Sequence, residues 1–477
     1  MKDRKYSYLL SILLCLLLVP VLTGCFTAAK TKTGSNTPQI VEVWHYYNGA
    51  QKSSFDDMVQ EFNDSVGMEQ GIVIEAVSKG SVGEMNQALS DSAEKKVGAD
   101  PLPQITAAYA NIAYSLAQQG LLADMNPYLT AGEQALYVDA YIDEGHFDGD
   151  ELWLFPTAKS TEMLTVNMTD WEAFAAETGA DIGDFQTWEG IVSLAQRFYD
   201  WSDGKAMFGR DAFANYMLVG SYQLGHDIFT VQDGKMILDF DQQSIKRLWD
   251  CYYTPYINGY FAAGGKFRSD DMKTGNVIAY VGSSASVTYT PTSVTFENGS
   301  SYDITCRLFP LPNFAGTTPC AVQQGAGMTV LKSNQETEAA AVMFLQWFTE
   351  PERNLEFCIQ AGYLPVTKEA NNEAALEKVL LERQLEVSEI MKQGLLVGVD
   401  EVTDYQLYSG KPFENGMEAR TVLDTAMPQK AEQDKAAIDE LVAGGVDRQE
   451  AIALYDTEEN FTQWYQETYQ KLKTLGE

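Results

Sequence analysis

Four consecutive ring-bearing side chains, Trp44 to Tyr47, follow an apolar run near the start of the chain. Such rings either stack against a ligand or pack in a core, and of the four only a histidine commonly exchanges protons near neutral pH. The three histidines, His45, His146 and His226, lie far apart in different local contexts, so we expect neither a catalytic nor a zinc site from them. We interpret the rings as one wall of a ligand site, with alternate members packed beneath it.

Signatures of catalysis are missing from the rest of the sequence. There is no nucleophile elbow, H-E-x-x-H motif, P-loop or dinucleotide glycine fingerprint. Carboxylates are so abundant that a glycosidase pair such as Glu84 with Glu162 arises by coincidence, and an extracellular glycosidase stays only a remote alternative. The net charge of −34 excludes nucleic acid as a partner. We expect no catalytic residue, no metal and no cofactor.

Alternating strands and helices position the rings at the end of a strand. We predict strands over 40–44, 72–77 and 104–108, and helices over 53–62, 84–95 and 110–119. This alternation is typical of right-handed crossovers and a largely parallel sheet. Ligands of such sheets sit beyond the carboxyl ends of the strands, where we expect Trp44, Tyr109 and the pair Ser283-Ser284 to lie.

The pattern then changes twice along the chain. A hairpin is predicted at Asp148-Gly149. A second, helix-rich region extends to about Leu311, with strands over 163–167 and 277–281, helices near 188–199, 212–224 and 244–256, and a hairpin at Asp233-Gly234. A strand over 327–331 and a helix over 334–349 capped by Asn334 then restore the alternation. This return indicates two lobes crossed more than once, followed by a helical, charged tail over 418–477.

The N-terminus predicts export. Basic residues precede an apolar run from Tyr8 to Leu22, and Leu22-Thr23-Gly24-Cys25 resembles the bacterial lipoprotein cleavage box. We expect residues 1–24 to be a lipoprotein signal peptide, Cys25 to carry the lipid, and residues 25–39 to form a flexible tether. An ordinary signal peptide with a chance cysteine is the alternative. On the lipoprotein interpretation the mature chain is an extracytoplasmic monomer, anchored by lipid to the outer face of the bacterial cell membrane.

Four cysteines remain in the mature chain, and their spacing fits no metal site. Three lie in apolar runs and one follows a Pro turn: Cys251, Cys306, Cys358 and Cys320. We expect buried thiols, although an exported chain also permits disulfides in any of three pairings.

Four segments carry a resemblance that extends from about Ile40 to the end of the chain: VWHYYNGAQKSSFDDMVQEFN, DGDELWLFPTAKSTEMLTVN, GNVIAYVGSSAS and AAVMFLQWFTEPERNLEFCIQAGYLPVTKEA. The last is the most specific, because a helix, a Pro-Glu break and Gly-Tyr-Leu-Pro-Val-Thr-Lys rarely occur in that order. Together they resemble the extracellular solute-binding lipoproteins of ABC importers, a class that includes maltose and sn-glycerol-3-phosphate binders.

The resemblance implies an α/β fold of the two-lobed, periplasmic-binding-protein-like type II, with a hinge between the lobes. The implied boundaries are 40–156 and 322–372 for lobe 1, and 157–321 and 373–477 for lobe 2. It also implies two partners, a small-molecule solute and the permease subunits of an ABC importer.

Within the class the chain is most similar to the glycerol-3-phosphate-binding branch. That similarity implies ligand contacts from Ser160, Ser283, Gly325, Tyr363 and Arg420. Their chemistry suits a phosphate: a bidentate guanidinium, two hydroxyl donors, a phenol, and a backbone N–H that glycine makes approachable. The expected function is therefore capture of glycerol-3-phosphate, or a related polyol phosphate, by hinge closure.

The chain departs from that branch at the glycerol end of the site. The branch has a tyrosine and an acid where this sequence has Val82 and Ala110. Glu84, Tyr109 or Asn111 are candidate substitutes. A different polyol phosphate, a glycerophosphodiester or an uncharged sugar would fit this change. The sugar alternative, a mono- or oligosaccharide, would stack on four rings: Trp44, Tyr46, Tyr47 and Tyr363.

Overall fold

The structure is a computed structural model that describes residues 38–147, 149–232 and 234–476. The predicted signal peptide, Cys25 and nearly all of the predicted tether lie outside the described residues. Within the described ranges, no helix has both the length and the apolar character needed to cross a membrane.

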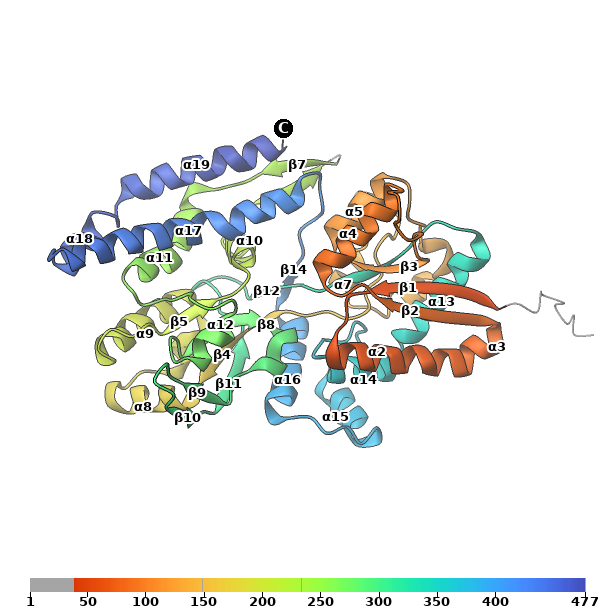
Figure 1. Ribbon diagram of the computed structural model, residues 1–477, viewed down its shortest axis with the longest axis horizontal. Helices are drawn as coiled ribbons and strands as arrows, with labels where there is room; N and C mark the ends of the chain where they lie inside the picture. The colour runs from red at the N-terminus through yellow and green to blue at the C-terminus, as the bar shows by residue number, and fades with distance from the viewer. Residues whose placement is uncertain (1–37, 148, 233, 477) are drawn as a thin grey trace, which may run out of the picture. The chain divides into compact units, whose positions relative to one another are not determined.

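The first lobe is built on a sheet with the strand order β13-β3-β1-β2 (Figure 1). Its strands are β1 (Gln39–His45), β2 (Ile72–Ser78), β3 (Ile105–Ala108) and β13 (Gly327–Val330). Strand β1 pairs in parallel with β2 and with β3, whereas β13 is antiparallel to β3. The largely parallel sheet predicted from the alternation is therefore confirmed, and its carboxyl edge receives the rings that follow β1.

Helices cover both faces of this sheet, and their apolar stripes explain where they pack. They are α2 (Gly49–Phe62), η1 (Asn63–Gly67), α3 (Met68–Gln70), α4 (Val82–Ala93), α5 (Ala110–Gln118), η2 (Asn126–Tyr128), α6 (Ala131–Gln134), α7 (Asp139–Asp143), α13 (Gln335–Phe348) and α14 (Pro351–Ala361). Phe55 and Phe62 of α2 are buried against Phe344 of α13. Asn334 caps α13 as predicted, because its side chain accepts a hydrogen bond from the Thr337 N–H at 3.0 Å.

The second lobe is built on a mixed sheet with the order β11-β4-β8-β5. Its strands are β4 (Glu162–Asn167), β5 (Phe208–Arg210), β8 (Ala279–Ser283) and β11 (Cys306–Pro310). The predicted hairpin near residue 233 is confirmed as β6 (Phe229–Gln232) and β7 (Lys235–Leu238), and a second small ribbon contains β9 (Ser293–Thr295) and β10 (Ser301–Asp303).

The helices of the second lobe come from the middle and the end of the chain. They are α8 (Met168–Thr178), η3 (Ile182–Gln186), α9 (Trp188–Trp201), α10 (Phe213–Gln223), α11 (Gln242–Ile257), α12 (Arg268–Lys273), η4 (Ser284–Tyr289), α16 (Glu389–Asp404), α17 (Gly416–Ala443), α18 (Arg448–Ala453) and α19 (Glu458–Gly476). The tail is helical as predicted, and α17 packs against α10 and α11. Helix α15 (Glu373–Glu382) packs against α14.

The segments that join the two lobes are themselves hydrogen-bonded to one another. Strand β12 (Cys320–Val322) pairs in parallel with β14 (Gln406–Tyr408), and both lie between the two sheets in Figure 1. The backbones of Ser160 and Gln324 exchange hydrogen bonds of 3.0 and 2.8 Å. Chain crossings tied together in this way are typical hinge positions. The boundaries at residues 156, 321 and 372 stay predictions.

The hairpin predicted at Asp148-Gly149 is not formed by the described residues around it. Asp148 itself lies outside them, and Phe155 forms an isolated antiparallel bridge with Met328 of β13 instead. The reason is burial: Leu152, Leu154 and Phe155 are at most 2% exposed and this segment packs on the first sheet, although the Trp153 N–H also donates to the Gly145 carbonyl at 2.9 Å.

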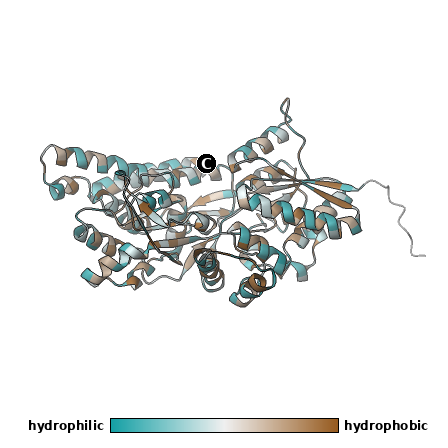
Figure 2. Ribbon diagram, turned by 60° about the horizontal axis from the view of Figure 1, so that its bottom comes forward, coloured by the Kyte–Doolittle hydropathy of each residue, from teal (hydrophilic) through white to brown (hydrophobic). Residues whose placement is uncertain are grey.

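Burial of apolar side chains follows the two sheets. The strands are largely brown in Figure 2, whereas the outer faces of the helices carry teal. The four described cysteines are free thiols, of which Cys251, Cys320 and Cys358 are buried and Cys306 is half-buried. The expectation of buried thiols is confirmed for three of the four, and no disulfide joins these described cysteines.

Candidate functional site

A cavity of about 550 Å³ lies between the two lobes. First-lobe residues from α4 and from the start of α5 line one side, and residues of α10 and α17 line the other. The segments that follow β12 and β14 also contribute lining residues. The polar groups among its lining residues are Asn86, Tyr109, Asn111, Glu144, Asn215, Gln323, Gln324, Ser409, Lys411, Arg420, Thr421 and Asp424. Its position agrees with the expected site beyond the carboxyl ends of the strands.

Arg420 presents a guanidinium to this cavity from the second turn of α17. The side chain is exposed and donates a hydrogen bond from Nη2 to the Oδ1 of Asn215. No carboxylate of the described residues lies within ion-pair distance of Arg420. A guanidinium with most of its fork free is suited to bidentate recognition of a phosphate or carboxylate.

A buried relay holds Asn215 in the orientation that Arg420 requires. Asn215 Nδ2 donates to Glu162 Oε1 at 2.7 Å, so its Oδ1 must face the arginine. Glu162 Oε2 accepts a hydrogen bond from Arg210 Nη2 at 2.7 Å, and Gln324 Nε2 donates to Glu162 Oε1 at 3.3 Å. Glu162 and Asn215 are each 1% exposed, and satisfied polar networks at such depth are rigid.

Two helices, α5 and α17, begin at the cavity. The first turns of α5 and α17 contribute lining residues, among them Asn111 and Gly416. Free N–H groups and the helix dipole make such N-termini favourable for anions. The carboxylate of Asp424 is already engaged, because it accepts a hydrogen bond from the Ala214 N–H at 2.9 Å.

Three tyrosines from the first lobe gather beside the cavity. The rings of Tyr46 and Tyr109 are stacked with centroids 6.3 Å apart, and the hydroxyl of Tyr46 interacts with those of Tyr109 and Tyr363. Burial raises the pKa of Tyr363 to about 12, with a further contribution from Tyr109. Burial also raises the pKa of Tyr109. The charge of Arg420 opposes this rise and the charge of Glu144 adds to it, so the Tyr109 phenol is within reach of charges from both lobes. All three hydroxyls are therefore neutral donors at physiological pH.

The other members of the opening ring cluster pack beneath this surface. Trp44 is fully buried in a cluster with Met85 and Leu89, and Tyr47 is 4% exposed against Phe357 and Phe55. His45 is also fully buried, and burial lowers its pKa to about 4. Tyr46 is the half-buried member of the four. We expected alternate rings to face the ligand site, but only Tyr46 of the four is in a position to do so.

The remaining predicted residues occupy three settings. Gly325 lines the cavity with a φ of +102°, and a Cβ there would lie 3.0 Å from the Ala158 carbonyl oxygen. Ser160 and Ser283 do not line the cavity in this conformation; Ser283 Oγ caps η4 by accepting from the Ala285 N–H at 3.3 Å. The Glu84 carboxylate accepts hydrogen bonds from Ser81 in the capping box of α4, outside the cavity lining.

Several polar residues of the cavity were missed by the sequence reasoning. Asn215 sits within the almost entirely apolar run of α10, and an isolated amide in such a run is the signal that would have singled it out. Gln323, Gln324 and Ser409 follow very short strands whose pairing is not visible in the sequence.

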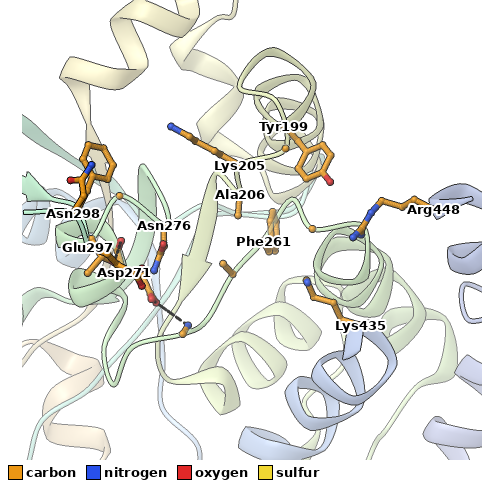
Figure 3. Close-up of a pocket in the computed structure, with 17 residues that line it drawn as sticks. Tyr199, Lys205, Ala206, Phe261, Asp271, Asn276, Glu297, Asn298, Lys435 and Arg448 are labelled. Atoms are coloured by element: carbon orange, nitrogen blue, oxygen red, sulfur yellow. Dashed lines mark hydrogen bonds between the residues drawn. The ribbon is translucent and has the colours of Figure 1, made fainter. Parts of the chain in front are cut away.

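A larger cavity of about 820 Å³ lies within the second lobe, away from the interlobe site (Figure 3). Two of its three basic lining residues, Lys435 and Arg448, are paired with Asp439 at 2.7 Å, and its buried Asp271 is paired with Arg268. Within the described part of the chain, none of the buried polar atoms that lack a partner belongs to its lining.

A sequence model of the family described as "Bacterial extracellular solute-binding protein" matches residues 57–379, which is more than half of the chain. The chain belongs to this family. Membership confirms the prediction of an extracellular binding protein that is not an enzyme. No match was found among curated proteins.

Solved structures of other solute-binding proteins share the fold. The cyclic α-maltosyl-1,6-maltose binding protein from Arthrobacter globiformis superposes with a TM-score of 0.68 at 20% identity, over 92% of this chain and 99% of that one. UgpB from Mycobacterium tuberculosis, solved with glycerophosphocholine, superposes with a TM-score of 0.63 at 17% identity, over 92% of this chain and 99% of that one. The GacH receptor of Streptomyces glaucescens, solved with acarbose, superposes with a TM-score of 0.60 at 14% identity, over 91% of this chain and 99% of that one. These matches confirm the two-lobed α/β fold of this solute-binding protein.

Proposed function

We propose that this solute-binding protein captures sn-glycerol-3-phosphate or a related polyol phosphate, glycerophosphodiesters included, and presents it to an ABC importer. The observation that carries the proposal is Arg420, an exposed guanidinium at the interlobe cavity that a buried relay orients through Asn215. Phosphate oxygens match the planar fork of arginine bidentately.

Two further features support an anionic ligand. The N-termini of α5 and α17 border the same cavity, so their N–H groups would add donors to those of Arg420. The similarity in fold to UgpB, which was solved with glycerophosphocholine, is consistent with this ligand class.

A neutral mono- or oligosaccharide is the second candidate, and the stacked pair Tyr46 and Tyr109 favours it. Aromatic faces beside a polar cavity suit the apolar faces of sugar rings. Similarly folded structures, such as the cyclic α-maltosyl-1,6-maltose binding protein, support this alternative as a class.

A thermal-shift panel distinguishes the two candidates. The mature protein is heated with glycerol-3-phosphate, glycerophosphocholine, maltose or glucose, and a bound solute raises the Tm by mass action, by an amount that grows with its concentration over Kd. We expect the phosphates to raise the Tm. A Tm that rises with the sugars and with neither phosphate would contradict the proposed ligand class.

Arg420→Ala tests the carrying observation directly. We expect it to weaken phosphate binding at least a hundredfold, because charge-assisted bidentate hydrogen bonds contribute about 1.5–3 kcal/mol each. Arg383→Ala is a matched control, since Arg383 lies at the end of α15, pairs with Glu356 at 3.2 Å and does not line the cavity. Equal losses in the two variants would show that Arg420 does not contact the ligand.

A further inference from the structure

Gln323 carries a buried amide for which the folded chain supplies no hydrogen bond. The side chain is 6% exposed, and neither its Nε2 nor its Oε1 has a partner among the described residues. Buried amides are nearly always satisfied, because desolvating one without a partner is costly. An amide left open at a cavity therefore requires an explanation.

The backbone around Gln323 is fixed, so the open amide is not a consequence of a mobile segment. Its N–H donates to the Tyr408 carbonyl in β14 at 2.8 Å, and the next residue exchanges two hydrogen bonds with Ser160. The side chain is a lining residue of the interlobe cavity, together with Gly325 and Arg420. It projects from the crossing between the lobes into the site.

Asn86 faces the same cavity from the first lobe. Its Oδ1 is buried and also lacks a partner within the described ranges, and the residue lies on α4. Two side-chain amides with unsatisfied hydrogen-bonding atoms therefore line one cavity. One amide lies on the interlobe crossing and the other on the first lobe.

The chemistry of an amide separates the ligand groups that it would accept. Gln323 offers two N–H donors and a carbonyl acceptor, whereas an ionised phosphate only accepts. A hydroxyl both donates and accepts, so a hydroxyl group, or a pair of neighbouring ones, satisfies both Nε2 and Oε1. The guanidinium of Arg420 suits the phosphate instead, because a guanidinium only donates hydrogen bonds and an ionised phosphate only accepts them.

We propose that Gln323 is a specificity-determining residue that binds the hydroxyl-bearing part of the solute, with Asn86 as its counterpart on the first lobe. The proposal rests on the proposed function, since it assigns the polyol end of the ligand whose anionic end contacts Arg420. A site built to bind hydroxyls rejects analogues without them, because the amide then stays buried and unpaired.

The test compares wild-type protein with Gln323→Leu, which keeps a similar volume and removes both polar atoms. Calorimetric titration with glycerol-3-phosphate and with 1-propyl phosphate gives the ratio of the two Kd values. We expect the wild type to prefer glycerol-3-phosphate by about a hundredfold or more, and Gln323→Leu to reduce that preference at least tenfold by weakening the hydroxylated probe alone. Equal weakening of both probes, or an unchanged ratio, would overturn the assignment.

The Tm of the ligand-free protein supplies a second readout that does not depend on the ligand's identity. Replacing an unsatisfied buried amide by an apolar group of similar shape should leave the Tm unchanged or raise it. A Tm lowered by several degrees would show that the amide is structural and would overturn the assignment. Ser221→Ala is the matched control, because Ser221 is fully buried, its hydroxyl lacks a partner in the described structure, and it does not line the cavity. It should leave both Kd values unchanged.

Failure of the proposed function gives a different pattern. If the wild type binds neither glycerol-3-phosphate nor 1-propyl phosphate but binds maltose, the proposal that the solute is a polyol phosphate is wrong. Gln323→Leu must then weaken maltose at least tenfold without lowering the Tm of the free protein. If maltose binding is unchanged in that variant, the proposal that Gln323 recognises hydroxyl groups is wrong as well.

Discussion

Glu401 shows how burial sets the charge of one side chain. It is fully buried on α16, where its Oε2 accepts from the Thr161 hydroxyl and its Oε1 from the Leu311 N–H, both at 2.6 Å. Burial raises the pKa of this carboxyl group to about 8 from an ordinary value of 4.5. Glu401 is therefore mostly protonated at neutral pH in the folded protein and ionised in the unfolded chain.

This difference predicts how stability depends on pH. Between about pH 6.5 and 8 the folded state holds a proton at Glu401 that the unfolded chain has released, so the free energy of unfolding should fall as pH rises, by up to about 1.4 kcal/mol per unit. Urea unfolding followed by tryptophan fluorescence at several pH values measures this slope.

Glu401→Gln should flatten the slope within that window. The window begins at pH 6.5 because His45, whose pKa burial lowers to about 4, contributes the opposite slope below its ordinary value of 6.5. A slope of the same size in the variant would assign the effect to another group.

Residues that line the cavity were named from the sequence only where a motif or a strand end indicated them. Tyr109, Gly325 and Arg420 line the cavity, and each had been named from a position in a motif or at a strand end. Asn215 was not named, because its role depends on a buried contact with Glu162 that brings together residues 53 apart in the chain. Spacing within the sequence does not reveal such long-range polar contacts.

The segment between β14 and α17 lines the cavity and contacts both lobes. Phe413 anchors it to the second lobe, with its ring 5.3 Å from that of Phe229 in β6. Lys411, two residues earlier, donates from Nζ to the carbonyl oxygens of Asp143 and His146 at the end of α7 in the first lobe. A cation on the carbonyls of a helix C-terminus is a favourable contact.

We therefore predict that Lys411, itself a lining residue of the cavity, slows release of the solute by holding the two lobes together. Lys411→Ala should raise the dissociation rate of the bound solute about 3- to 10-fold, since such hydrogen bonds contribute about 0.5–1.5 kcal/mol. Stopped-flow displacement measures this rate.

Lys368→Ala is the control for that measurement. Lys368 is also exposed and contacts the same helix, through Asp139 at 2.7 Å, but it connects parts of the first lobe only. If both variants, or neither, change the dissociation rate, the contact of Lys411 does not contribute to closure.

Elements were predicted well where local periodicity decides them. The strands β1 and β2 and the capped start of α13 were expected within one or two residues of their observed bounds. The hairpin at residue 148 was wrong because a turn dipeptide indicates a local reversal only, whereas burial of Leu152 and Phe155 against the first sheet decides the pairing of this segment.

At the scale of the whole molecule, we propose that Cys25 carries a lipid that holds the acidic protein at the outer face of the membrane. Cells that express the full chain should incorporate a labelled fatty acid into the wild type and not into Cys25→Ser. Release of the wild type and the variant into the medium in equal amounts would contradict the anchor. The net charge of −34 favours a protein that stands off an anionic surface on a tether of the predicted kind.

The two-lobed architecture was predictable because it follows from strand–helix alternation and its interruption. Which segments cross between the lobes was harder to predict: β12 and β14 contain three residues each, too few for a periodic signal. These short strands also position Gln323, which is one reason why the sequence did not reveal this residue.

The free thiols described above have a consequence for how this protein matures. None of the four described cysteines is joined to another, and burial raises the pKa of the Cys251, Cys306 and Cys320 thiols to about 12. Because the thiolate is the reactive form, these groups resist oxidation once the chain has folded. Folding of the described part of the chain therefore involves no disulfide between these four cysteines.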